Sequence, residues 1–182
     1  EDLSVLIDNL PANATGWTQV GLTPNSPNQI IVQGFNNTGP LRSLTSPPVF
    51  SFSAPPIESR ILSFTGTSAT LSWASNGNPA GTGFKLEKAL DPVSFVFSSS
   101  GTNTSATAVG LSDGATYYFR VNAINGNGIE SGFDSVVSLF IPLSPPVSPG
   151  NPSVISRSTT SLTWKWKDNS QNEEGFRVLR DS

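Results

Sequence analysis

The chain has 182 residues, with no Cys, His or Met, 13% charged residues and a formal net charge of −3. The lack of Cys excludes a disulfide framework and a zinc finger, and the lack of a basic cluster argues against nucleic acid or anionic membrane as partners. No stretch approaches the roughly 18 apolar residues of a membrane span. Residues 1–10 lack a signal-peptide pattern and there is no initiator Met, so we expect the chain to be part of a longer protein.

The elements predicted along the chain are short strands separated by turns. Alternating polar and apolar residues, or strand-forming residue types, mark residues 15–22, 30–36, 69–73, 83–86, 94–97, 104–111, 117–123, 162–166 and 175–178. Turn signals stand between them at residues 76–79, 113–114 and 125–128, and Pro-rich joints at 53–57 and 142–152. No window keeps a helical period, so an all-β sandwich or barrel is expected.

The chain repeats itself with a period of about 90 residues. Trp166 follows Trp73 by 93 residues, and Gly175-Phe176 follows Gly83-Phe84 by 92. Residues 104–111 (TSATAVGL) match residues 15–22 (TGWTQVGL) at five of eight positions. Further on, the correspondences pair Val121 with Val32, Ala123 with Gly34, Asn125 with Asn36 and Gly128 with Gly39.

These elements, taken in order, resemble the fibronectin type III domain over nearly the whole chain. The resemblance rests on a Pro-Pro boundary, a strand ending in Trp73 or Trp166, a Gly-Phe-x-Val/Leu strand, and Leu111 six residues before Tyr117. Residues 166–176 look like the bacterial version. One departure is Asn28, which stands where Tyr117 would form the tyrosine corner. The resemblance implies immunoglobulin-like β-sandwiches in tandem.

The repeat predicts one complete domain flanked by two complementary halves. Residues 1–54 are expected to be the C-terminal half of a domain, 55–143 a complete domain, and 144–182 an N-terminal half completed by residues 1–54 of the next copy. The expected partners are therefore identical copies end to end, the Ser182 side of one meeting the Glu1 side of the next, with lateral self-association also considered. Three completions stay open: a covalent array, separate chains that trade halves, and a closed ring, which the short stiff Ala54-Pro55-Pro56 link disfavours.

No catalytic, cofactor-binding or metal site is predicted, and none of the usual hydrolase pairings can form without His or Cys. The densest acidic group is Asp168, Glu173 and Glu174, which could bind calcium through its oxygens. The plainer interpretation is that Asp168 and Asn169 organise a turn by hydrogen bonds to the backbone.

The aromatic residues raise the question of carbohydrate binding. Trp73, Trp164 and Trp166 share the parity of the apolar strand face and are expected in a core, as is Trp17. Phe95 and Phe97, in an expected edge strand, are better candidates for an exposed contact, although packing inside or between domains is the preferred interpretation. Glycosylation acceptor patterns begin at Asn13, Asn36 and Asn103 and arise easily by chance in a chain rich in Ser, Thr and Asn.

The function predicted from the sequence is a non-enzymatic structural repeat of an extracellular or cell-surface filament. The alternative is a spacer, accessory or adhesive module of a larger secreted enzyme or adhesin. A third class, an enzyme in its own right, would need turnover from this segment alone.

Overall fold

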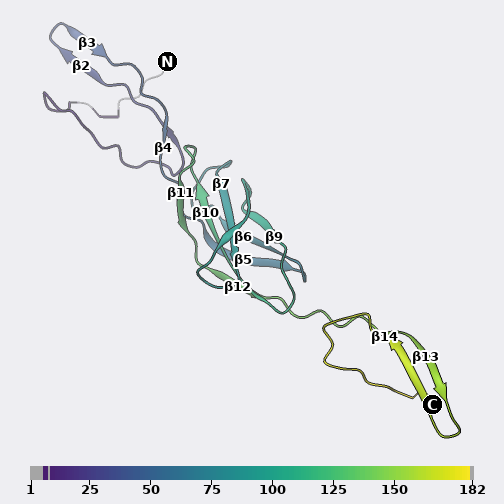
Figure 1. Ribbon diagram of the computed structural model, residues 1–182. Helices are drawn as coiled ribbons and strands as arrows, with labels where there is room; N and C mark the ends of the chain where they lie inside the picture. Colours follow the sequence, from purple (N-terminus) through teal and green to yellow (C-terminus); the bar gives the residue numbers. More distant parts are fainter. Residues whose placement is uncertain (1–5, 8, 181–182) are drawn as a thin grey trace. The chain divides into compact units, whose positions relative to one another are not determined.

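The computed structural model describes residues 6–7 and 9–180. All regular elements among these residues are β-strands, so the predicted all-β class is confirmed. The chain divides into two compact units, Glu1–Ile141 and Pro142–Ser182 (Figure 1), which are described one at a time.

The centre of the first unit is an antiparallel sandwich of two sheets. One sheet has the order β5–β6–β9, and the other β11–β10–β7–β8, with β12 also paired to β10. The strands are β5 (Ile57–Phe64), β6 (Ser68–Ala74), β7 (Gly83–Ala89), β8 (Val96–Gly101), β9 (Ser105–Val109), β10 (Thr116–Ile124), β11 (Glu130–Phe133) and β12 (Val137–Phe140).

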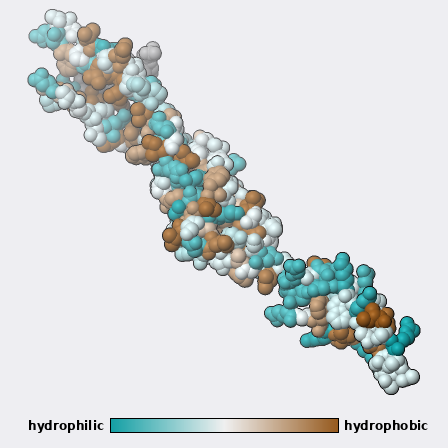
Figure 2. All heavy atoms as spheres, in the orientation of Figure 1, coloured by the Kyte–Doolittle hydropathy of each residue, from teal (hydrophilic) through white to brown (hydrophobic). Residues whose placement is uncertain are grey.

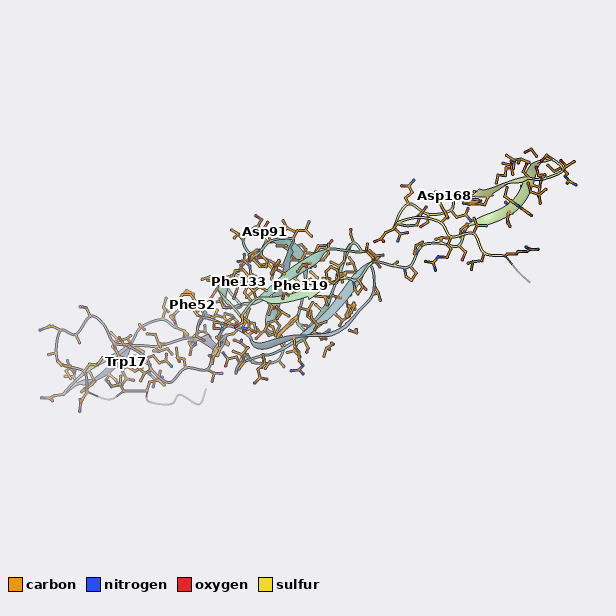
Figure 3. The ribbon with its side chains drawn as sticks, turned by 90° about the horizontal axis from the view of Figure 1, so that it is seen from below. Trp17, Phe52, Asp91, Phe119, Phe133 and Asp168 are labelled. Carbon is orange, nitrogen blue, oxygen red and sulfur yellow. The ribbon has the colours of Figure 1, made fainter. Side chains whose placement is uncertain are left out.

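The core lies between these two sheets, where alternate residues of each strand point inward. Figure 3 shows Phe119 inside the sandwich, and Trp73 lies in the core as expected. The buried core cluster includes Leu71, Trp73, Phe84, Leu86, Tyr117, Phe119 and Val121. The rings of Trp73 and Phe84 meet across the sheets with centroids 5.7 Å apart. Full burial of one such side chain contributes roughly 1.5–3 kcal/mol.

Two polar contacts fasten the edges of this core. The hydroxyl of Tyr117 accepts a hydrogen bond from the backbone amide of Ser112 at 3.0 Å, which closes the corner before β10. The carboxylate of Asp134 accepts one from the amide of Ser59 at 2.8 Å and so ties the beginning of β5 to the chain that follows β11.

Residues 9–54 of the same unit form two short antiparallel pairs. β1 (Pro27–Asn28) pairs with β4 (Val49–Phe50), and β2 (Gln33–Asn36) pairs with β3 (Gly39–Arg42) in a hairpin. Figure 2 shows apolar side chains on the visible surface of this segment, and the exposed ones include Val20, Ile30, Val32, Phe35 and Leu41. Trp17, expected in a core, is 37% exposed because no second sheet lies over it among the described residues.

The second unit is a single antiparallel pair, β13 (Gly150–Arg157) and β14 (Leu162–Lys167). Trp164 and Trp166 are 51% and 39% exposed, so the expected core burial is wrong for this unit by itself. The physical reason is that a two-stranded sheet has no facing layer. Trp166 keeps one aromatic partner, Phe176, with ring centroids 5.5 Å apart.

Candidate interdomain interface

Residues 23–54 are fastened to one end of the central sandwich by a set of asparagine side chains. Asn25 is buried and makes two hydrogen bonds to the central sandwich: its Nδ2 donates to Thr82 Oγ1 at 2.8 Å, and its Oδ1 accepts from the amide of Gly126 at 2.8 Å. Both polar atoms of one amide side chain are thus satisfied across the junction. Asn25 adopts φ = 49°, a left-handed conformation that Asn tolerates better than most residues.

Phe50 docks on the loop that follows β10. A Cβ at Gly126 would lie 2.4 Å from the carbons of the Phe50 ring, so this close approach requires glycine. The amide of Phe50 donates to Asn127 Oδ1 at 2.8 Å, and Asn125 Nδ2 donates to the carbonyl of Ser51 at 3.2 Å. The loop itself is held by Asn125 Oδ1, which accepts the amides of residues 127 and 129.

A third contact holds the link between the two parts. Buried Asn78 pairs with both backbone groups of Ala54: its Oδ1 accepts the Ala54 amide at 2.9 Å, and its Nδ2 donates to the Ala54 carbonyl at 2.7 Å. Asn76 Nδ2 donates to the carbonyl of Pro55 at 2.8 Å. We call the residues Asn25, Phe50, Asn78, Asn125, Gly126 and Asn127 the asparagine clamp.

The sequence pattern predicts turns at residues 76–79 and 125–128, and both segments contain turns, but the pattern does not predict the contacts of the clamp. The available signal was the concentration of Asn in both loops at the same end of one domain, which gives more amide donors and acceptors than the turns need.

The outer face of the β8–β7–β10–β11 sheet carries a charged network. Lys85 forms ion pairs with Glu130 at 2.6 Å and with Glu87 at 3.1 Å, and Arg120 pairs with Glu87 at 2.7 Å. Partial burial would lower the pKa of Lys85, but hydrogen bonds to Glu130 and Glu87 outweigh it and raise the pKa. The pKa of Glu130 is lowered by the hydrogen bonds that it accepts from Lys85 and Asn122.

Phe95, one of the two aromatic residues considered for an exposed contact, packs against Arg120 of the same charged network. The Arg120 guanidinium lies 4.1 Å from the ring centroid of Phe95 and 3.8 Å from that of Phe133. Phe95 is therefore partly buried within its own domain, as the preferred interpretation expected, whereas Phe97 is 62% exposed.

In the acidic group at 168–174, the side chains of Asp168 and Asn169 bond to the backbone, and the chain bends at residues 171 and 174. Asp168 accepts the amide of Ser170 at 3.0 Å, and Asn169 Nδ2 donates to the carbonyl of Ser148 at 3.0 Å. Within the described part of the chain, no three acidic side chains come together in a way that could hold a metal ion. Of the glycosylation patterns, Asn36 uses its side chain to accept the amide and the hydroxyl of Thr38.

Comparison with known proteins agrees with this architecture. Residues 53–138 match the family model of the fibronectin type III domain. This part of the chain is a fibronectin type III domain. Such domains are typically non-catalytic modules, and no helix in residues 6–7 and 9–180 is long and apolar enough to cross a membrane.

Two curated relatives contain similar sequence. A Kelch domain-containing protein of Saccharolobus solfataricus is 29% identical over 167 residues, which are 85% of this chain and 20% of that protein. Chitinase A1 of Niallia circulans is 30% identical over 137 residues, 70% of this chain and 19% of the enzyme. The chain thus spans about a fifth of the length of each. Among solved structures, the sixth domain of human fibronectin type III domain containing protein 3 is 30% identical, with 52% of this chain and 88% of that one covered and a TM-score of 0.41.

Proposed function

We propose that the chain is a structural repeat of an extracellular or cell-surface filament, in which residues 144–182 of one copy and 1–54 of the next complete a second fibronectin type III domain. The coarser function, a structural or accessory module, follows from the family. Glu1 and Ser182 lie outside the described residues, so the proposal rests on residues 9–54 and 142–180.

The observation that carries the proposal is a pair of threonines. In the complete domain β6 pairs with β9, and the hydroxyls of Thr70 and Thr107 meet across these strands at 2.9 Å. The repeat places Thr163 at the position of Thr70 and Thr18 at the position of Thr107. Each half therefore keeps one member of the equivalent pair, and the two threonines stand 145 residues apart in one copy (163 − 18).

The exposed apolar residues support the same pairing. Phe176 and Val178, the counterparts of buried Phe84 and Leu86, are 45% and 73% exposed in the second unit, and Val32, the counterpart of buried Val121, is 60% exposed in the first. Each half presents the face that is core in the complete domain. Burial of each of these side chains would contribute roughly 1.5–3 kcal/mol. Completion of the domain would also cover the open sheet edges, which otherwise invite pairing with other chains.

The alternative is an accessory module of a secreted enzyme or adhesin. The similarity to part of a chitinase favours it, because this chain matches only a fifth of that enzyme's length. In that case a domain with another activity would stand beside one or two copies, and the protein would remain monomeric.

The experiment that separates these functions is a fusion of two 182-residue copies. We expect the fusion to gain a third cooperatively folded domain at its middle, in which the strands that carry tryptophan are protected from protease. Longer fusions should form fibres in electron micrographs. A fusion whose middle segments remain protease-sensitive would contradict completion of the domain. A folded but strictly monomeric series would favour the accessory module.

A further inference from the structure

The asparagine clamp holds one end of the complete domain. At the opposite junction, the sequence repeat supplies counterparts for Asn25, Phe50, Asn125 and Gly126 of the clamp and for Thr82, which bonds to Asn25. Comparison of the two sets shows whether the same contact can form at both junctions. The inference below rests on the proposed completion of the second domain.

The first set of counterparts is fixed by backbone geometry. Asn25 and Gly114 are both left-handed, with φ of 49° and 73°, and each stands two residues before a cross-strand pair, Pro27–Phe50 and Thr116–Phe140 respectively. The amide of each also donates to the closing strand, Asn25 to Phe52 at 3.1 Å and Gly114 to Ile141 at 2.8 Å. Gly114 is therefore the counterpart of Asn25, and Phe140 that of Phe50.

The loops that receive these residues also correspond. Asn125 Oδ1 accepts the amide two residues later at 3.0 Å, and Asn36 Oδ1 accepts the amide two residues later at 2.8 Å. Asn37 thus stands where the clamp has Gly126. On the neighbouring loop, Glu174 precedes Gly175 as Thr82 precedes Gly83.

Three of these substitutions remove the contacts of the clamp. Glycine at 114 has no side chain to replace the two hydrogen bonds of Asn25. Asn37 has a Cβ at the position of Gly126, where an added Cβ would lie 2.4 Å from carbons of the Phe50 ring. Glu174 has a carboxylate in place of the Thr82 hydroxyl that accepts from Asn25.

We propose that the part of the asparagine clamp on the complete domain (Asn78, Asn125, Gly126 and Asn127) forms, with Thr82, a selective docking surface. This surface fits the domain end of a neighbouring fold that carries Asn25 and Phe50 and does not fit the homologous end that carries Gly114 and Phe140. Fixed and compliant junctions then alternate along the array. The partner is a second type of domain end from this same chain, and the selectivity also sets the order in which the two domain types follow each other.

The test uses the two-copy fusion, into which pairs of cysteines can be introduced cleanly because the chain has none. Spin labels at exposed Thr45 and Ser112 of the second copy report the clamped junction, and labels at exposed Thr102 and Arg157 of the first copy report the other. Pulsed electron paramagnetic resonance should give a narrow distance distribution for the first pair and a clearly wider one for the second.

Exchange of the residues between the junctions provides the matched variants. Asn25→Gly with Gly126→Asn should broaden the first distribution to the width of the second, and glycine at 25 adds no backbone strain because its φ is already positive. Gly114→Asn with Asn37→Gly and Glu174→Thr should narrow the second distribution.

The two proposals fail differently. Equal widths in a fusion whose middle domain is folded, or exchange variants that leave the widths unchanged, overturn the selective clamp alone. A middle domain that remains unfolded, shown by its protease sensitivity, overturns the proposed function and the clamp's role in an array with it.

Discussion

The ring of Phe50 lies against Gly126, so closely that an added Cβ would be 2.4 Å from the ring carbons. Residues that are 76 positions apart (126 − 50) are thereby held in contact within one unit. The contact has no role inside the β-sandwich core, and its consequence is to fix the segment before the domain against the domain itself.

Gly126→Ala should release this contact. Because the methyl group cannot fit, the Phe50 ring must move, and the hydrogen bond from its amide to Asn127 should be lost, at a cost of roughly 1 kcal/mol. Hydrogen exchange of the Phe50 amide should accelerate by about fivefold or more. Gly101→Ala is the matched control, since an added Cβ there meets nothing within 4 Å. Unchanged exchange at Phe50 would show that the close approach is absent in solution.

Asn78→Ala should loosen the link at Ala54. The substitution leaves the amide and carbonyl of Ala54 without their side-chain partner, and loss of such buried hydrogen bonds costs about 1–3 kcal/mol. Limited proteolysis should cut near residues 52–55 faster in this variant. The exposed loop substitution Asn103→Ala should behave as the unmodified chain. Cleavage of Asn78→Ala no faster than of Asn103→Ala would show that Asn78 does not hold the link at Ala54.

Tyr117→Phe should lower the stability of the complete domain by roughly 1 kcal/mol, because the amide of Ser112 loses the hydroxyl that accepts from it. The urea midpoint of unfolding measures this change, and Tyr118→Phe, on the neighbouring half-buried position, is the control. A larger loss for Tyr118→Phe would contradict the role of the corner.

Asp134→Asn should make the free energy of unfolding depend less steeply on pH in the acidic range. Partial burial would raise the pKa of Asp134, but the hydrogen bonds from Ser59 and Ser135 outweigh burial and lower it. A carboxyl whose folded pKa lies below its unfolded value, about 3.9, stabilises the fold above that pH and loses this contribution as the pH falls through the folded pKa. Urea unfolding between about pH 5 and pH 2 measures the slope, with Glu58→Gln at an exposed site as control. A slope unchanged by Asp134→Asn would refute the assignment.

The sandwich could be predicted because its evidence is local and periodic. Inward positions such as Leu71, Trp73 and Phe119 alternate with polar residues, and the strand period alone places them on one face. The same rule does not predict the exposure of Trp164 and Trp166. The alternation shows on which face of a strand a side chain lies, but not whether a second sheet covers that face.

The clamp could not be predicted, because it depends on contacts between distant loops. Asn25 and Gly126 are 101 positions apart, and each belongs to a segment that turn chemistry alone explains. Likewise, Arg120 in β10 contacts the rings of Phe133 in β11 and of Phe95 just before β8, and no spacing within one of these segments reveals the contact.

The central claim is that residues 144–182 of one copy and 1–54 of the next form one domain. A disulfide tests it most directly, in a two-copy fusion with Thr163→Cys in the first copy and Thr18→Cys in the second. This pair should cross-link rapidly on oxidation, as fast as Thr70→Cys with Thr107→Cys, whose native hydroxyls are 2.9 Å apart. As a control, Thr163→Cys in the first copy with Thr38→Cys in the second copy should not cross-link. Failure of the Thr18–Thr163 pair in a protein whose Thr70–Thr107 pair does cross-link would contradict the claim.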